Sequence, residues 1–126
     1  MTKNIIETDE APKAIGPYSQ AVLSENLLFT SGQLPIDPAA GKIVDGPIEE
    51  RTHMVLKNIE AIARKAGTSL DNVVKTTVFL TDMGDFQAVN KVYAEYFKEP
   101  FPARSAYQVA ALPLGANIEI EAIFRV

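Results

Sequence analysis

The sequence predicts an α/β (α+β) fold, in which one domain over residues 1–126 forms a mixed β-sheet with two helices on one face. Residues 48–66 and 84–97 carry apolar side chains at helical spacing, and residues 72–80 between them are mostly β-branched or aromatic. Two short segments of alternating side chains close the chain. Because 47% of the 126 residues are hydrophobic, the chain can fill a single core.

The first third of the chain predicts a loop followed by two strands. Residues 7–18 are rich in acidic residues, proline and glycine, which is a loop composition. Strands are expected at 20–23 and 27–33. The Ser31-Gly32 pair near the end of the second strand is typical of a bulge or bend, and alternatively Gly32 lets a ligand approach backbone donors closely.

A short strand is expected around residues 42–44, followed by the first helix. Apolar positions recur at helical spacing from about residue 48 to residue 66, and Gly67 fits the position just after a helix C-terminus. His53 lies among polar neighbours in the first half of this helix, so we expect a solvated surface histidine.

The middle of the chain predicts a central strand and the second helix. The strand at 72–80 is apolar on both faces, which favours an inner position in the sheet. Asp82 can cap the helix expected at 84–97, which ends before a proline. Asn90 shares the apolar stripe of this helix, so its amide is either a structural clamp or part of the edge of a site.

The last two strands are expected at 103–110 and 118–124, on either side of a Leu-Pro-Leu-Gly turn. Strand 72–80, helix 84–97 and strand 103–110 form a βαβ unit, for which a right-handed parallel crossover is expected. Alternation in the last strand separates an apolar face from a face with two carboxylates. The residues predicted to face the helices are Ile118, Ile120, Ala122 and Phe124, and those predicted to face away are Glu119, Glu121 and Ile123.

One sheet face is expected to remain uncovered by helices. Its apolar residues, predicted to be Val73 or Val74, Ala106, Ala110 and Ile123, would expose a larger patch than monomers usually tolerate. The sequence therefore predicts a homo-oligomer.

Composition argues against several classes of protein. The formal charge is -4 and the basic residues are scattered, so nucleic acid is not an expected partner. No cysteine and one histidine leave too few ligands for a zinc or iron site, so no metal is expected. The chain shows neither a secretion signal nor an apolar run long enough for a membrane span, so we expect a cytoplasmic protein that does not enter membranes.

Five stretches resemble the Rid (reactive intermediate deaminase, YjgF-type or L-PSP) family, and its RidA branch in particular. They span nearly the whole chain, and Pro-Ala-Arg-Ser followed by Ile-Glu-Ile-Glu-Ala is a specific signal. The stretches are Ala14-Ile15-Gly16-Pro17-Tyr18-Ser19-Gln20, Phe29-Thr30-Ser31-Gly32-Gln33-Leu34-Pro35, Val74-Lys75-Thr76-Thr77-Val78-Phe79-Leu80, Phe101-Pro102-Ala103-Arg104-Ser105 and Ile118-Glu119-Ile120-Glu121-Ala122.

The resemblance implies a chorismate-mutase-like fold and a homotrimer with a central barrel of sheets, helices outside and active sites in clefts between subunits. It implies a 2-iminobutanoate/2-iminopropanoate deaminase that hydrolyses imines released by pyridoxal-phosphate enzymes to 2-oxo acids and ammonia. It also implies that neither a cofactor nor a metal is used.

The resemblance also implies roles for individual residues. Arg104 matches the arginine that grips the substrate carboxylate, and a guanidinium suits this role because it binds a carboxylate in bidentate fashion. Glu119 matches the acid that orients the attacking water. The residues that match the lining of the family's pocket are Tyr18, Ser31, Gly32 and Asn90, together with Ala106, where many RidA proteins carry cysteine.

Arg104 and Glu119 also have other interpretations. Both lie near the starts of antiparallel strands, so we expect roughly 15 Å or more between them within one chain, and a shared substrate would then need two chains. Arg104 could instead form a structural ion pair with Glu119 or Glu121 across an interface. As a whole, the chain could be a non-catalytic module that binds 2-oxo acids or docks on an enzyme. A ribonuclease is disfavoured by the acidic charge balance, and chorismate mutase activity would rest on fold alone.

Overall fold

The computed structural model describes residues 3–126, in which six strands form one mixed sheet in the order β1-β2-β3-β8-β6-β7. Residues 1 and 2 of the expected domain lie outside the described residues. The strands of the sheet are β1 (Lys3–Ile6), β2 (Ala21–Ser24), β3 (Leu27–Thr30), β6 (Val73–Leu80), β7 (Ala103–Gln108) and β8 (Ile118–Arg125). The remaining elements are the hairpin β4 (Ile36–Asp37) and β5 (Lys42–Ile43), the helices α1 (Ile48–Lys65) and α2 (Phe86–Tyr96), and the short 3₁₀ turns η1 (Leu70–Asn72), η2 (Met83–Asp85) and η3 (Pro113–Gly115).

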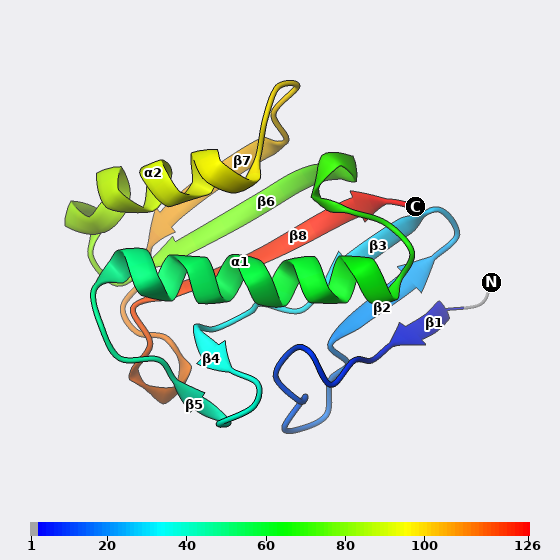
Figure 1. The fold of residues 1–126 in the computed structure, drawn as a ribbon, viewed down its shortest axis with the longest axis horizontal. Helices are drawn as coiled ribbons and strands as arrows, with labels where there is room; N and C mark the ends of the chain where they lie inside the picture. The colour runs from blue at the N-terminus through cyan, green and yellow to red at the C-terminus, as the bar shows by residue number, and fades with distance from the viewer. Residues whose placement is uncertain (1–2) are drawn as a thin grey trace.

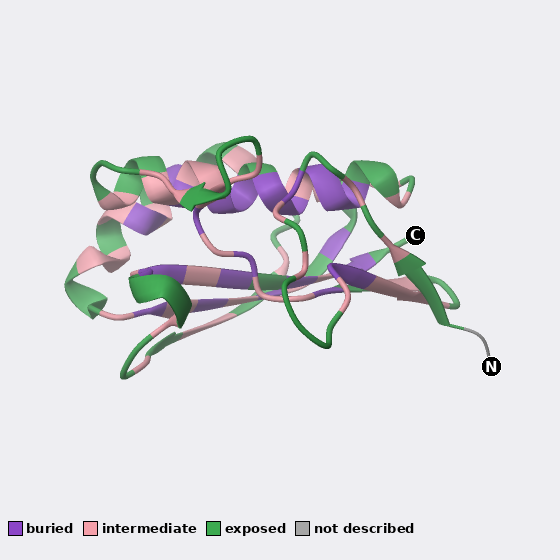
Figure 2. Cartoon of the chain, turned by 90° about the horizontal axis from the view of Figure 1, so that it is seen from below, coloured by how far each residue is buried: buried purple, intermediate pink, exposed green. Residues whose placement is uncertain are grey.

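Both helices lie on the same side of the sheet, as the sequence predicts (Figure 2). In Figure 1, α1 crosses in front of β8, and α2 lies beside α1 near β6 and β7. β6 and β7 are parallel and are joined through α2, whereas β8 is antiparallel to β6. The predicted βαβ unit and the inner position of β6 are therefore confirmed. β1 was not predicted, because its four residues are largely exposed and lack an apolar alternation.

The core lies between the helices and the sheet face that they cover. β8 alternates along its length, with Ile118, Ile120, Ala122 and Phe124 buried. α1 ends as expected, since Gly67 has a left-handed φ of 84° immediately after the C-terminal turn. Asp82 caps the turn that precedes α2, where its side chain accepts a hydrogen bond from the Gly84 amide at 2.8 Å.

The end of β3 shows the predicted irregularity. Regular pairing stops at Thr30, three residues before the expected end of the strand. The chain then rejoins β8 at Gln33, whose N–H donates to the Ile120 carbonyl at 2.8 Å while the Ile120 N–H donates back at 3.1 Å. Ser31 and Gly32 thus form a bend between two points of contact with the sheet.

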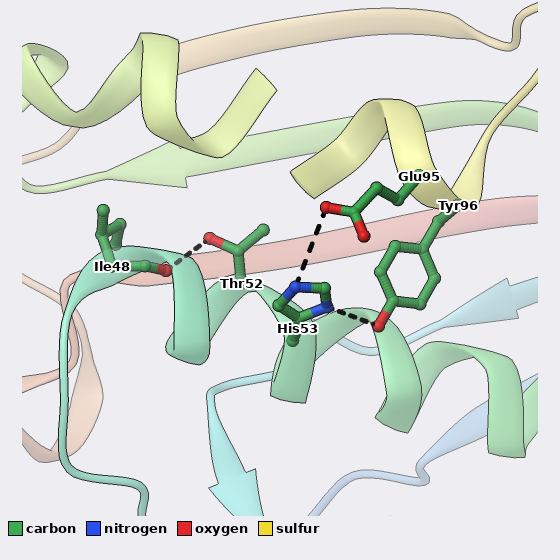
Figure 3. A network of polar contacts seen from close by, with 5 residues as sticks. All are labelled: Ile48, Thr52, His53, Glu95 and Tyr96. Carbon is green, nitrogen blue, oxygen red and sulfur yellow. Dashed lines mark hydrogen bonds and ion pairs between the residues drawn. The ribbon is translucent and has the colours of Figure 1, made fainter. Parts of the chain in front are cut away.

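His53 is partly exposed, with 35% of its side chain accessible, but it also makes contacts that its polar neighbours did not suggest. Figure 3 shows its ring between α1 and α2. Its Nδ1 lies 2.8 Å from the Tyr96 hydroxyl, and its Nε2 lies 3.9 Å from a carboxylate oxygen of Glu95. Sequence reasoning missed this contact because His53 and Tyr96 are 43 positions apart.

The uncovered sheet face agrees with the prediction only in part. Ile123 lies on it by register, and Val74 is exposed. Val73 is buried, and Ala106 packs against the core on the helix side. Ala110 is exposed but lies beyond the end of β7. By register, the apolar side chains on the open face include Phe29, Phe79, Tyr107 and Ile123. No helix within residues 3–126 has the length and apolar character needed to cross a membrane.

Candidate active site

A cleft of about 660 Å³ opens where the 12–20 loop, the Ser31–Gly32 bend, η3 and the start of β8 meet. Four of the residues singled out from the sequence line it: Tyr18, Ser31, Gly32 and Glu119. The other lining residues are Pro12, Lys13, Ile15, Gln20, Gln33, Leu34, Ile36, Pro113, Leu114 and Glu121. Most of this lining is apolar, so the few polar groups determine what the cleft can bind.

Glu119 is the half-buried carboxylate of the cleft. Burial raises its pKa above the usual range, and the neighbouring Glu121 carboxylate raises it further by repulsion. No lysine or arginine of residues 3–126 forms an ion pair with it. A carboxylate with a raised pKa that faces a cleft is suited to accept a proton from a bound water.

Tyr18 and Ser31 are held in the cleft by backbone groups. The Tyr18 hydroxyl accepts a hydrogen bond from the Ile15 N–H at 3.2 Å, and its side chain remains half exposed. The Ser31 hydroxyl donates to the Ser19 carbonyl at 2.6 Å. This bond ties the bend after β3 to the loop that carries Tyr18, so the two walls of the cleft are joined.

Gln20 organises the same loop, and sequence reasoning missed it. Its side chain is 3% exposed, and its amide nitrogen donates to the carbonyls of Thr8, Ala11 and Pro12 at 3.0, 3.3 and 2.7 Å. Its carbonyl oxygen accepts the Thr8 N–H at 2.7 Å. A glutamine so close to a strand start resembles any polar strand residue, so only the three-dimensional contacts identify it.

Arg104 and Asn90 lie outside this cleft, next to each other. Arg104 is exposed, and its Nη1 donates to the Asn90 Oδ1 at 2.7 Å. Asn90 is half-buried on α2, and this bond is compatible with both roles considered for its amide, a structural clamp and the edge of a site. Ala106, two residues farther along β7, lies on the same sheet face and packs against the core.

Within one chain, Arg104 and Glu119 cannot contact the same small molecule. Arg104 is level with Thr76 of β6 and faces α2, whereas Glu119 is level with Phe79 and faces the open side. Three residues along the strands and two strand spacings across them separate the two backbones by about 14 Å, at about 3.3 Å per residue and about 4.8 Å per strand. The two ions also lie on opposite faces of the sheet, which the sequence did not predict.

Among residues 3–126, no three His, Cys, Asp or Glu side chains come together in a way that could hold a metal ion. The polar groups that line the cleft are the carboxylates of Glu119 and Glu121, the ammonium group of Lys13, the hydroxyls of Tyr18 and Ser31, and the side-chain amides of Gln20 and Gln33. Such groups can orient a water molecule and move its protons.

Known proteins resemble this chain over almost its full length. The model of the family described as "Endoribonuclease L-PSP" matches residues 8–126. The human protein named "2-iminobutanoate/2-iminopropanoate deaminase" is 52% identical over 123 residues, which cover 98% of this chain and 90% of the human protein. A crystal structure of a Rid family protein from Yersinia pestis superposes with a TM-score of 0.97 at 52% identity and covers 99% of this chain and all of the other. TdcF from E. coli, solved with bound serine, has a TM-score of 0.92 at 44% identity and covers 98% of each chain.

Proposed function

Because the chain belongs to the L-PSP family, which includes the Rid proteins, we propose that it is a deaminase that hydrolyses 2-imino acids such as 2-iminobutanoate and 2-iminopropanoate. The observation that carries this proposal is Glu119, a half-buried carboxylate with a raised pKa that faces a cleft and forms no ion pair with a lysine or arginine of residues 3–126. The human relative at 52% identity bears the name of this activity.

The reaction needs little more than orientation, because an imine carbon is already electrophilic. The Glu119 carboxylate accepts a proton from a water, whose oxygen adds to the imine carbon, and the proton passes to the imine nitrogen. In the resulting 2-amino-2-hydroxy acid, the hydroxyl proton passes to the amino nitrogen and the C–N bond breaks, which releases ammonia and leaves the 2-oxo acid. One imino acid and one water thus give one 2-oxo acid and one ammonia, without a cofactor or metal ion.

Arg104 binds the substrate carboxylate in this proposal. Apart from Asn90, no residue of 3–126 forms a hydrogen bond with the Arg104 guanidinium, so its other N–H groups can form a bidentate pair with a carboxylate. Tyr18, Ser31 and Gly32 line the cleft around Glu119, and Asn90 holds Arg104. Ala106 lies beside Arg104 on β7 and contacts the imine through its backbone.

Two chains contribute to each site in this proposal. Arg104 and Glu119 lie on opposite sheet faces, so Arg104 of one protomer meets Glu119 of its neighbour in a homotrimer. The exposed Phe29 and Tyr107 of the open face support such an assembly, since a second copy would cover them. Light scattering is expected to give three times the 13.7 kDa chain mass. A monomer would contradict the shared site.

The test of the activity is the loss of 2-iminobutanoate generated in situ by a threonine dehydratase. We expect the wild-type protein to accelerate this loss and Arg104→Ala to abolish the acceleration while the oligomer persists. Arg64→Ala is the matched control, because Arg64 is exposed and forms only a 3.7 Å ion pair with Glu10. Full activity in Arg104→Ala would refute the role given to Arg104, and an inactive wild-type protein that binds 2-oxobutanoate would support a binding module instead.

The family description raises a second candidate, an endoribonuclease. The cleft contains Glu119 and Glu121 against the single cation Lys13, and the chain carries a net charge of -4. A site for a phosphate backbone needs several cations, so these charges disfavour RNA. RNA cleavage that persists in Arg104→Ala after further purification would favour the ribonuclease.

A further inference from the structure

The Arg104 guanidinium lies against two aromatic rings of α2. Its central carbon is 4.8 Å from the centroid of the Tyr93 ring and 5.2 Å from that of Phe86. Both distances are within the roughly 6 Å at which an aromatic face attracts a cation. Asn90 accepts a hydrogen bond from the same guanidinium at 2.7 Å. Phe86, Asn90 and Tyr93 are spaced at i, i+4 and i+7, so one stripe of a single helix presents all three.

The Tyr93 ring is fixed by the strand next to Arg104. Tyr93 is 6% exposed, and its hydroxyl shares a 2.7 Å hydrogen bond with the Thr76 hydroxyl, which is fully buried. Thr76 is also the residue of β6 that pairs with Arg104. Tyr93 further packs on Phe97, with ring centroids 4.3 Å apart. The ring therefore has little freedom to move relative to the backbone of β7.

The electrostatics of Tyr93 suit a platform for a cation. Burial is the largest influence and raises the pKa of its hydroxyl, whereas the Thr76 hydrogen bond and the charge of Arg104 lower it to a smaller extent. The phenol thus stays neutral at physiological pH. Its uncharged ring presents an electron-rich face to the guanidinium without forming an ion pair that would compete with a carboxylate ligand.

We propose that Phe86 and Tyr93 are positioning residues, whose rings hold the guanidinium of Arg104 in the orientation that receives the substrate carboxylate. An arginine side chain without contacts would lose much conformational entropy when it binds a carboxylate. A guanidinium that is already held against two rings loses less. This inference rests on the proposed function for the identity of the anion. It goes beyond that function in assigning the affinity for the carboxylate partly to α2.

The test uses Phe86→Leu and Tyr93→Leu, which keep apolar volume and remove one aromatic face each. An exposed cation–π contact is worth about a factor of two to five in affinity, so we expect KM to rise about threefold for either variant with kcat within twofold of the wild type. The dissociation constant of 2-oxobutanoate, measured by calorimetry, should rise by the same factor. Tyr93→Phe keeps the ring and should restore affinity.

Two controls separate positioning from general damage to the fold. Tyr96→Leu removes another aromatic residue of α2 that contacts His53, so it should lower Tm and leave KM unchanged. In an Arg104→Ala background, Phe86→Leu should have no further effect on 2-oxobutanoate binding, because the rings act only through Arg104. Phe86 is half-buried, so Phe86→Leu remains informative if Tyr93→Leu does not fold.

Unchanged KM and binding in Phe86→Leu, or an equal loss of binding in the Arg104→Ala background, would overturn the inference. If the wild-type protein binds 2-oxobutanoate but hydrolyses no imine, the proposed function fails while the binding measurements still decide the role of the rings. If the wild-type protein neither hydrolyses 2-iminobutanoate nor binds a 2-oxo acid, both proposals fail.

Discussion

Gly32 lies directly against the side chain of Glu119. A Cβ atom built on Gly32 would be 2.7 Å from the Glu119 Cδ and 3.0 Å from its Cγ, closer than real Cβ atoms tolerate. The φ of Gly32 is not in the left-handed region, so close approach and not backbone conformation requires glycine here. The bend after β3 thus determines where the candidate base of the cleft can sit.

Gly32→Ala is therefore expected to displace the Glu119 carboxylate and to lower kcat by at least about tenfold, since small displacements of a catalytic group cost large factors in rate. Stability should change less than activity, because the Glu119 side chain can move into the cleft. Gly84→Ala is the control, since a Cβ there would lie 3.0 Å from an Asp82 oxygen, outside the cleft. Equal kcat in both variants would show that Gly32 does not position Glu119.

Glu121→Gln tests the electrostatic influence on Glu119. The Glu121 carboxylate contributes to the raised pKa of Glu119, so its neutralisation should lower that pKa, although burial keeps it above the usual range. Activity requires the ionised Glu119 and is lost as pH falls through its pKa. We therefore expect the acid limb of the kcat/KM profile to move to lower pH in Glu121→Gln. Glu95→Gln, which alters an exposed carboxylate on α2, should leave the limb in place.

Gln20→Leu tests the loop that carries Tyr18. The substitution removes the buried amide that bonds Thr8, Ala11 and Pro12, and leaves their backbone groups without these partners. At about 1–3 kcal/mol for an unsatisfied buried group, and with partial rehydration of the loop, urea titration should show a loss of about 2–3 kcal/mol in unfolding free energy. KM should rise as Tyr18 is released. Gln108→Leu, which loses one exposed bond to Met83, should cost less than about 1 kcal/mol.

The contact between His53 and Tyr96 is expected to couple α1 to α2. A double-mutant cycle with His53→Ala and Tyr96→Phe, measured by urea unfolding, should give a coupling free energy of about 0.5–1.5 kcal/mol, the net value of one hydrogen bond. The 3.9 Å approach to Glu95 is partly exposed, so the corresponding cycle with Glu95→Gln should give about 0–1 kcal/mol. Additive effects of His53→Ala and Tyr96→Phe would mean that the helices are held together by apolar packing alone.

The sheet faces show where the sequence prediction failed. The register between β6 and β8 shifts between Val73 and Lys75, so Val74 is the extra residue of a bulge and Val73 turns to the buried side. Neither face of β7 is clearly apolar. Ala106 shares its face with the polar residues Arg104 and Gln108, and the other face consists of Ala103, Ser105 and Tyr107. The sequence therefore could not show that Ala106 faces the core. The faces of β8 were predicted correctly, because apolar residues alternate with charged ones along most of this strand.

The sequence by itself determined the features that depend on neighbouring residues: the helical period of α1 and α2, the alternation of β8, the glycine after α1 and the bend at Ser31-Gly32. Only the tertiary structure decided that Tyr18, Ser31, Gly32 and Glu119 line one cleft while Arg104 and Asn90 meet on the other face of the sheet. The physical reason is that pairings such as Gln33 with Ile120 join segments far apart in the chain. Local periodicity carries no information about the register of such pairings, which the packing of the whole sheet determines.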